Sequence, residues 1–290
     1  MPTKILNRRT RLVVLLLALC AAVVGYYYYV KNAVRVEVVQ FNSDLIAKGM
    51  PYGVVLPRGY HLITSGRTRY PVLYLLHGWR EHYNSWIKHT SLVRYASDYQ
   101  LIIVTPEGDN GWYTDSATIG SDQYETYLLY ELITDVDSRY RTIQDRRGRA
   151  VAGNSMGGYG ALKFGLKHPE IFSLAASMSG ALDANIRNDE ASIRQTFGEP
   201  NSATRAANDL QRLARDFPHE RAPLLPYFYL DCGTDDPWLA VNRDFVNILL
   251  ERKMVHEYRQ LPGGHIWVYW DREINEVLRV AAERMVPPEH

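Results

Sequence analysis

The chain has little of what marks several classes of protein. It carries only two cysteines, Cys20 and Cys232, which cannot form the disulfide framework of a small secreted domain, so we expect two free thiols. Its 33 basic and 32 acidic residues nearly cancel, which leaves no basic field for nucleic acid and no acidic tail. The nine histidines lack metal-ligand spacings such as H-E-x-x-H. We therefore expect no nucleic-acid partner, no catalytic metal and no cofactor.

Internal repeats, low-complexity tracts and a long flexible stalk are also missing. A chain of 290 residues with 46% hydrophobic residues can bury one large core, and an α/β domain of this size needs no second domain. We expect one folded domain over residues 31–290. The sequence sets no oligomeric state.

One long uncharged run lies near the N-terminus, from Leu12 to Val30. A helix of this length is just long enough to cross a bilayer, and the four tyrosines at 26–29 resemble an interfacial aromatic belt. We expect residues 1–30 to form an uncleaved signal anchor, and a cleaved signal peptide is the alternative. Four basic residues precede the run: Lys4, Arg8, Arg9 and Arg11.

This basic cluster predicts the orientation of the anchor. Positive residues favour the cytoplasmic side, so the rest of the chain should lie outside. The predicted location is a single-pass cell-membrane protein whose folded domain is extracytoplasmic. If the leader is cleaved, the domain is secreted or periplasmic.

The remaining chain alternates strand-like and helical segments. Residues 124–140 have helical spacing, and a second helix should end near residue 167. The alternation predicts an α/β fold with a mainly parallel central sheet, helices on both faces and antiparallel strands at its start. Ligands of such sheets bind beyond the carboxyl ends of the strands. The expected strands are 34–41, 50–56, 70–76, 101–105, a short strand ending before residue 155, 172–178, 227–232 and 257–261.

Residues 183–222 break this alternation. They are polar and charged, with Gly198-Glu199-Pro200 in the middle and no evident strand. The segment is either a solvated helical excursion or a cap inserted over the site.

The motif Gly153-Asn154-Ser155-Met156-Gly157 is the first chemical signal. A G-x-S-x-G at a strand-to-helix turn is the nucleophile elbow of serine hydrolases. The turn is so tight that side chains at the two flanking positions would collide, so both are glycine. Ser155 is therefore the candidate nucleophile.

A serine nucleophile needs an adjacent base. The best candidate is His265, because its paired glycines follow the last predicted strand, where this kind of fold places the base. His77 competes with it, but its position before Gly78 at a strand end is that of a loop-shaping residue.

The group that orients the base should follow the strand at 227–232. Asp231, Asp235 and Asp236 compete for this role. Asp231 should still lie in the strand. Asp236 precedes a proline, which also fits a helix N-cap. The order Ser155, Asp236, His265 matches the serine–acid–histidine order of the α/β-hydrolase fold.

An oxyanion hole needs two hydrogen-bond donors. The backbone N–H of Met156, at the start of a helix, should supply one. The loop at 77–80, after the strand ending at Leu76, should supply the other.

Four motifs together resemble the esterase D-like family of α/β-hydrolases: LYLLHGW, AGNSMGGYGAL, DCGTDDPWL and PGGHIWVYW. The family includes S-formylglutathione hydrolases, feruloyl, acetyl-xylan and tributyrin esterases, and mycolyltransferases. The resemblance covers roughly residues 34–284 and implies a triad of Ser155, Asp236 and His265.

The resemblance also implies roles for several neighbours. The family's oxyanion donors fall on the backbone of Met156 and Trp79, and Gly78 shapes that loop. The stretch at 109–113 looks like a substrate-facing loop, which makes Trp112 and Tyr113 candidates for substrate binding. Aromatic residues near the proposed site loops fit either substrate walls or ordinary packing: Trp79, Trp112, Tyr113, Tyr159, Trp238 and Trp267.

The expected function is a serine carboxylesterase that hydrolyses an ester of a small, phenolic or sugar-linked acyl group through an acyl-enzyme. The substrate would be a small molecule or a glycan ester. One alternative is an acyltransferase that passes the acyl group to a sugar or lipid hydroxyl. Mycolyltransferases usually carry glutamate as the acid, so Asp236 favours a hydrolase, and the anchor argues against the formylglutathione substrate. A second alternative is a non-catalytic binding protein.

Overall fold

The computed structural model describes residues 8–62, 65–188 and 190–289. Its core is an eight-stranded sheet in the order β1-β4-β6-β5-β7-β8-β9-β10. β4 is antiparallel to both neighbours, while β6, β5 and β7 to β10 are all parallel, which confirms the mainly parallel sheet. The strands are β1 Arg35–Val39, β4 Tyr52–Leu56, β5 Val72–Leu76, β6 Ile102–Pro106, β7 Arg149–Asn154, β8 Leu174–Met178, β9 Tyr227–Gly233 and β10 His256–Leu261, with a separate two-stranded ribbon of β2 Asn42–Ser43 and β3 Lys48–Gly49.

Helices cover both faces of this sheet, because its strands alternate their side chains between two apolar cores. In β7, Val151 faces one core, whereas Ala150 and Ala152 face the other. α5, α6 and α10 pack on the Val151 face; α2, α3 and α11 pack on the opposite face. The bounds are α2 Ser85–His89, α3 Leu92–Ala96, α4 Tyr124–Thr126, α5 Ile133–Arg139, α6 Met156–Lys167, α10 Leu239–Glu251 and α11 Trp267–Arg284.

The helix expected at 124–140 has three parts. A π-helical segment, η2 (Tyr127–Leu132), joins α4 to α5. Four of its six residues are buried: Tyr127, Leu128, Leu129 and Leu132. The apolar spacing of the sequence does not distinguish the two kinds of turn.

The segment at 183–222 folds as short helices, and it contains no strand within its described residues. It buries Ile193, Phe197 and Leu210 in the main core. Arg205 is buried and donates to the carbonyl oxygens of Gly198 (2.9 Å) and Arg187 (2.8 Å), so one side chain ties the polar segment together. The elements are η4 Ala184–Ile186, α7 Ala191–Phe197, α8 Ala203–Ala207, α9 Leu210–Arg215 and η5 His219–Leu224.

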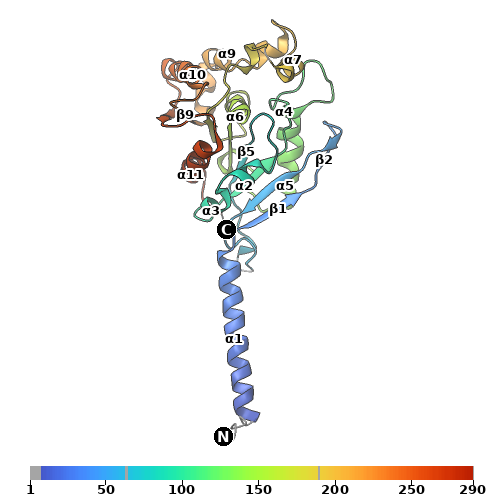
Figure 1. Cartoon of the computed structure of the whole chain (residues 1–290), viewed down its shortest axis with the longest axis vertical. Helices are drawn as coiled ribbons and strands as arrows, with labels where there is room; N and C mark the ends of the chain where they lie inside the picture. Colours follow the sequence, from blue (N-terminus) through green and yellow to red (C-terminus); the bar gives the residue numbers. More distant parts are fainter. Residues whose placement is uncertain (1–7, 63–64, 189, 290) are drawn as a thin grey trace.

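The first helix, α1 (Arg8–Asn32), projects from the domain (Figure 1). Its side chains are exposed except that of Val30, and its best 18-residue window has a mean hydropathy of 2.1. Among the described residues it is the one helix long and apolar enough to cross a membrane, a test that a signal sequence also passes. Residues 1–7, with Lys4, lie outside the described part. Cys20 is exposed on α1, Cys232 is buried in β9, and both are free thiols.

A buried charge cluster joins α6 to residues 113–114 of the loop after β6 and to α4. Lys163 of α6 donates to Glu125 and to the Thr114 hydroxyl, both at 2.7 Å, and to the carbonyl oxygen of Tyr113. Glu125 also contacts Lys167 (2.7 Å) and His168 (2.9 Å). Burial raises the pKa of Glu125, but the charges of Lys163 and Lys167 and the hydrogen bond from His168 outweigh burial and hold the pKa well below its usual range.

Replacing Glu125 with glutamine should destabilise the protein strongly. Lys163 is fully buried, so Glu125→Gln leaves a cation in the core without its counter-ion, at a cost of about 3–5 kcal/mol. Urea unfolding should show this as a lower transition midpoint. The matched control is Glu170→Gln, whose contacts are long and exposed, and which should change stability by less than about 0.5 kcal/mol. Equal midpoints for the two variants would contradict the role of the cluster.

Candidate active site

Ser155 lies at the sharp turn between β7 and α6. Its φ of 53° and ψ of −116° are rare for a residue with a side chain. A Cβ on Gly153 would lie 2.5 Å from the carbonyl carbon of Gly157, and a Cβ on Gly157 would lie 2.5 Å from the carbonyl oxygen of Leu76. Both flanking positions therefore need glycine, as the motif predicts.

The structure brings Ser155, His265 and Asp236 into one hydrogen-bonded chain. The Ser155 Oγ lies 3.0 Å from His265 Nε2, and His265 Nδ1 lies 3.0 Å from Asp236 Oδ2. An ionised carboxylate only accepts, so Nδ1–H donates to Asp236 and Nε2 is left to accept from the serine hydroxyl. This arrangement suits transfer of the serine proton to Nε2.

The three aspartates that compete for the orienting role, of which Asp236 is the predicted one, lie in different environments. Asp236 is buried, and its second oxygen accepts the N–H of Trp238 at 2.8 Å. Burial raises the pKa of Asp236, but the hydrogen bonds from His265 and Trp238 outweigh it and hold the pKa below its usual range. Asp231 lies in β9, where burial raises its pKa, and Asp235 is exposed.

Asp236 does not cap α10 directly. The helix begins at Leu239, and its N-cap position is Trp238. Asp236 instead closes the turn that precedes the helix, which holds its carboxylate in place beside His265.

The positions expected for the oxyanion hole lie beside the serine. A Cβ on Gly78 would come within 3.5 Å of the Ser155 Cβ, so the loop at 77–80 packs against the nucleophile turn. Met156 is the first residue of α6, where backbone N–H groups have no partner within the helix. The N–H of Trp79 donates to no acceptor within the described part of the chain.

The side chains of His77 and Glu107 fix the loop at 77–80 and the loop after β6 through contacts with their backbones. His77 is buried; its Nδ1 lies 2.8 Å from the carbonyl oxygen of Gly78, and its Nε2 lies 3.0 Å from the backbone nitrogen of Gly108 and 3.3 Å from Glu107 Oε1. Glu107 accepts the N–H groups of Tyr83 (3.2 Å) and Asp109 (3.0 Å). Burial raises the pKa of Glu107, but the contacts with His77 and these N–H groups bring it down to about 2.

Trp112 and Tyr113, expected to bind substrate, are buried in the interior and do not line the pocket at Ser155. Only 4% of Trp112 and 1% of Tyr113 is exposed, and both have a φ near 50° that turns the loop inward. The Tyr113 hydroxyl donates to the carbonyl oxygen of His77 at 3.0 Å, and the Trp112 indole faces the hydroxyl of Ser192 at 3.3 Å. Tyr113 thus supports the loop at 77–80, whereas the Trp112 ring packs against Tyr159 and Phe197, and neither side chain lines the pocket at Ser155.

The pocket at Ser155 has a volume of about 440 Å³. Gly78, Trp79 and Trp267, which the sequence places near the site, line it, as do Glu81, Ile266 and Trp270, which the sequence does not indicate. Only spatial packing reveals Glu81, whose carboxylate accepts the indole N–H of Trp267 at 3.1 Å. No described residue of 183–222 lines this pocket.

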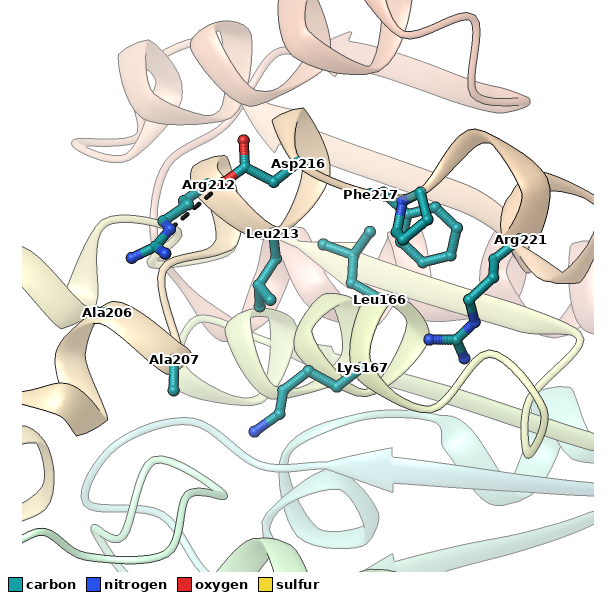
Figure 2. A pocket seen from close by; sticks show the side chains of 10 residues that line it. Leu166, Lys167, Ala206, Ala207, Arg212, Leu213, Asp216, Phe217 and Arg221 are labelled. Carbon is teal, nitrogen blue, oxygen red and sulfur yellow. Dashed lines mark hydrogen bonds and ion pairs between the residues drawn. The ribbon is translucent and has the colours of Figure 1, made fainter.

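A second hollow, of about 390 Å³, lies at the C-terminal end of α6 (Figure 2). Its walls include Leu166, Lys167, Leu213 and Arg212. The three cations there have carboxylate partners: Arg212 pairs with Asp216, Lys167 with Glu125, and Arg221 with Glu170 at 3.6 Å. The hollow is lined by none of the three residues of the hydrogen-bonded chain.

Glu107→Gln should lower stability in a pH-dependent way. The pKa of Glu107 is about 2 in the folded chain against 4.5 unperturbed, so its carboxylate stabilises the fold above about pH 4.5, on the order of 3 kcal/mol. That contribution is lost as the pH falls from 4.5 toward 2. Denaturant midpoints of wild type and variant should therefore converge over this range, while the exposed control Glu220→Gln matches wild type throughout. A gap that stays constant with pH would refute the assignment.

Comparison with known proteins agrees with this geometry. The family model described as "Putative esterase" matches residues 43–280. The acetyl esterase of Caldicellulosiruptor saccharolyticus is 31% identical over 213 residues, which are 70% of this chain and 79% of that protein.

Solved structures agree as well. A ferulic acid esterase superimposes with a TM-score of 0.77 at 26% identity, over 88% of this chain and 99% of its own. The fluorophosphonate-binding serine hydrolase FphF of Staphylococcus aureus gives 0.74 at 26% identity, over 86% and 98%. The chain therefore belongs to the esterase family, has the α/β-hydrolase fold and is a serine hydrolase of carboxylic esters.

Proposed function

We propose that Ser155, His265 and Asp236 form the catalytic triad of a carboxylesterase that works through an acyl-enzyme. One observation carries the proposal: two hydrogen bonds of 3.0 Å link the hydroxyl, the imidazole and the buried carboxylate in series.

In the first half of the reaction, the Ser155 Oγ attacks the ester carbonyl carbon as its proton passes to His265 Nε2. The imidazolium that forms is stabilised by Asp236, whose lowered pKa keeps it ionised. The carbonyl oxygen takes up the negative charge and is met by the N–H groups of Met156 and Trp79. Collapse of the intermediate breaks the ester bond, and His265 returns the proton to the leaving alkoxide.

In the second half, water replaces the alcohol. His265 takes a proton from water, the hydroxide attacks the acyl carbon, and the Ser155 Oγ leaves with the proton from Nε2. The products are a carboxylic acid and free enzyme.

The pocket supports an uncharged ester as substrate. Trp79, Trp267 and Trp270 offer apolar walls, whereas Glu81 places a carboxylate among them. A carboxylate accepts hydrogen bonds from hydroxyl groups and repels anionic substrates. Small, phenolic or sugar-linked acyl groups fit these walls, in agreement with the acetyl and ferulic acid esterases to which the chain is similar.

The alternative of acyl transfer uses the same acyl-enzyme. A sugar or lipid hydroxyl would then replace water in the second half. Adding glycerol or trehalose to the assay separates the two: an acylated acceptor indicates transfer, and free acid alone indicates hydrolysis.

In this proposal α1 is an uncleaved anchor, and the domain from residue 31 onward lies outside the cytoplasm. The length of the apolar helix and the cluster of Arg8, Arg9 and Arg11 at its N-terminal end support it.

Ser155→Ala should abolish labelling by a fluorescent fluorophosphonate. The probe reacts only with an activated serine, so the full-length wild type in detergent should be labelled with one fluorophore per chain. The matched control is Ser173→Ala, which changes a serine outside the site. Absent labelling of wild type, or equal labelling of Ser155→Ala, would remove the assignment.

Asp236→Asn should lower kcat for p-nitrophenyl acetate by about ten-thousand-fold, because the amide favours the wrong imidazole tautomer. Its exposed neighbour provides the control: Asp235→Asn should keep nearly full turnover. The converse result would transfer the orienting role to Asp235.

A further inference from the structure

We propose that the active site faces away from the membrane that holds the chain, while the opposite edge of the sheet rests on lipid headgroups. The esters that reach Ser155 are then carried by molecules outside the bilayer, and lipids of the same membrane are neither acyl donors nor acceptors. This inference rests on the proposed anchor and esterase activity.

The junction between α1 and the domain is short and stiff. α1 ends at Asn32, and β1 begins at Arg35. The N–H of Ala33 donates to the carbonyl oxygen of Tyr29 at 2.9 Å, which extends the helical bonding toward the strand. All five residues of β1 pair with β4. The domain therefore has little freedom to turn its other side toward the bilayer.

The junction lies at the amino ends of the parallel strands. A hollow of about 490 Å³ is lined by Lys31 and Asn32 together with Tyr70 and Gln100, which precede β5 and β6. A Cβ on Gly59 would lie 3.8 Å from the carbonyl oxygen of Lys31, so the end of α1 also approaches the loop after β4.

Ser155 lies at the other edge. β5 runs from Val72 to Leu76 and leads into the loop at 77–80 beside the serine. Its five residues span about 17 Å at about 3.3 Å each. Figure 1 shows α7 and α9, which follow β8 in the chain, at the end of the molecule opposite α1.

The length of the uncharged part of α1 places the surface of the bilayer relative to the domain. The uncharged run from Leu12 to Val30 spans about 28 Å as a helix, close to the thickness of the hydrocarbon core. Lys31 therefore lies at the level of the headgroups, and the domain begins there without a stalk.

The face of the domain at the level of the headgroups carries five basic residues, which we call the basic collar: Lys31, Arg35, Arg58, Arg67 and Arg69. Residues 31–35 and 57–70 contain no acidic residue. Two acids lie close to these segments: Glu37 accepts the Tyr140 hydroxyl at 3.0 Å, and Glu289, which bridges to Arg69, lies 3.9 Å from Arg147. A surface with this charge fits the phosphate groups of lipid headgroups.

Energy transfer can test the orientation without catalysis. In a Cys20→Ser background, a donor dye is placed on Gln100→Cys, beside the collar, or on Thr234→Cys, after the carboxyl end of β9; both positions are exposed. The full chain is reconstituted in phosphatidylcholine–phosphatidylglycerol vesicles with an acceptor on the headgroups. Transfer should be strong from position 100 and weak from position 234. Equal transfer, or release of the chain by carbonate, would overturn the orientation.

A second measurement tests the substrate class. In the same vesicles, wild type should cleave soluble p-nitrophenyl acetate but cleave 1,2-dioleoyl-3-acetylglycerol in the bilayer at least an order of magnitude more slowly. Inserting about 24 Gly/Ser residues between Asn32 and Ala33, with a reach of about 27 Å, should raise lipid turnover and leave soluble turnover unchanged. Fast lipid turnover by wild type would overturn the inference. If the wild type fails to cleave soluble p-nitrophenyl acetate, the proposed esterase function is wrong. The orientation is still tested in that case, because energy transfer from the dyes does not depend on catalysis.

Discussion

The site depends on one close approach of backbone to backbone. The turn that carries Ser155 presses Gly157 against the carbonyl oxygens of Leu76 and His77, with no space for a Cβ. This contact sets the nucleophile turn beside the loop at 77–80, which belongs to a different strand. The distance between the attacking oxygen and the proposed N–H donors therefore follows from the packing of β5 against β7 and not from any single side chain.

Two buried pairs of polar side chains support this contact. Lys163 and Glu125 fix α6 to the loop after β6, and His77 and Glu107 fix the loop after β5 to the same region. Tyr113 connects them, because its carbonyl oxygen accepts from Lys163 and its hydroxyl donates to the backbone of His77. Such groups are costly to bury unless every partner is present, so they favour one arrangement of the loops.

The sequence predicted the sheet, most strands within two residues, and the order of the three triad candidates. It could do so because apolar runs, glycine spacing and position along the chain are local signals. Among three competing aspartates it selected Asp236, from chain order and the family resemblance, and only the packing of two loops brings that residue to His265. It misplaced Trp112 and Tyr113, because a left-handed backbone turns them inward. Glu81 and Trp270 were missed because they are far apart in the chain: Glu81 reaches the pocket from the loop after β5, and Trp270 reaches it from α11.

Cys232 has a consequence for the chemical durability of the domain. It is buried in β9 a few residues before Asp236, and burial raises the pKa of its thiol to about 12. Oxidation and disulfide exchange proceed through the thiolate, which is almost absent at neutral pH with such a pKa. The free sulfhydryl in the core of the domain is therefore protected from oxidation and disulfide exchange by its own burial.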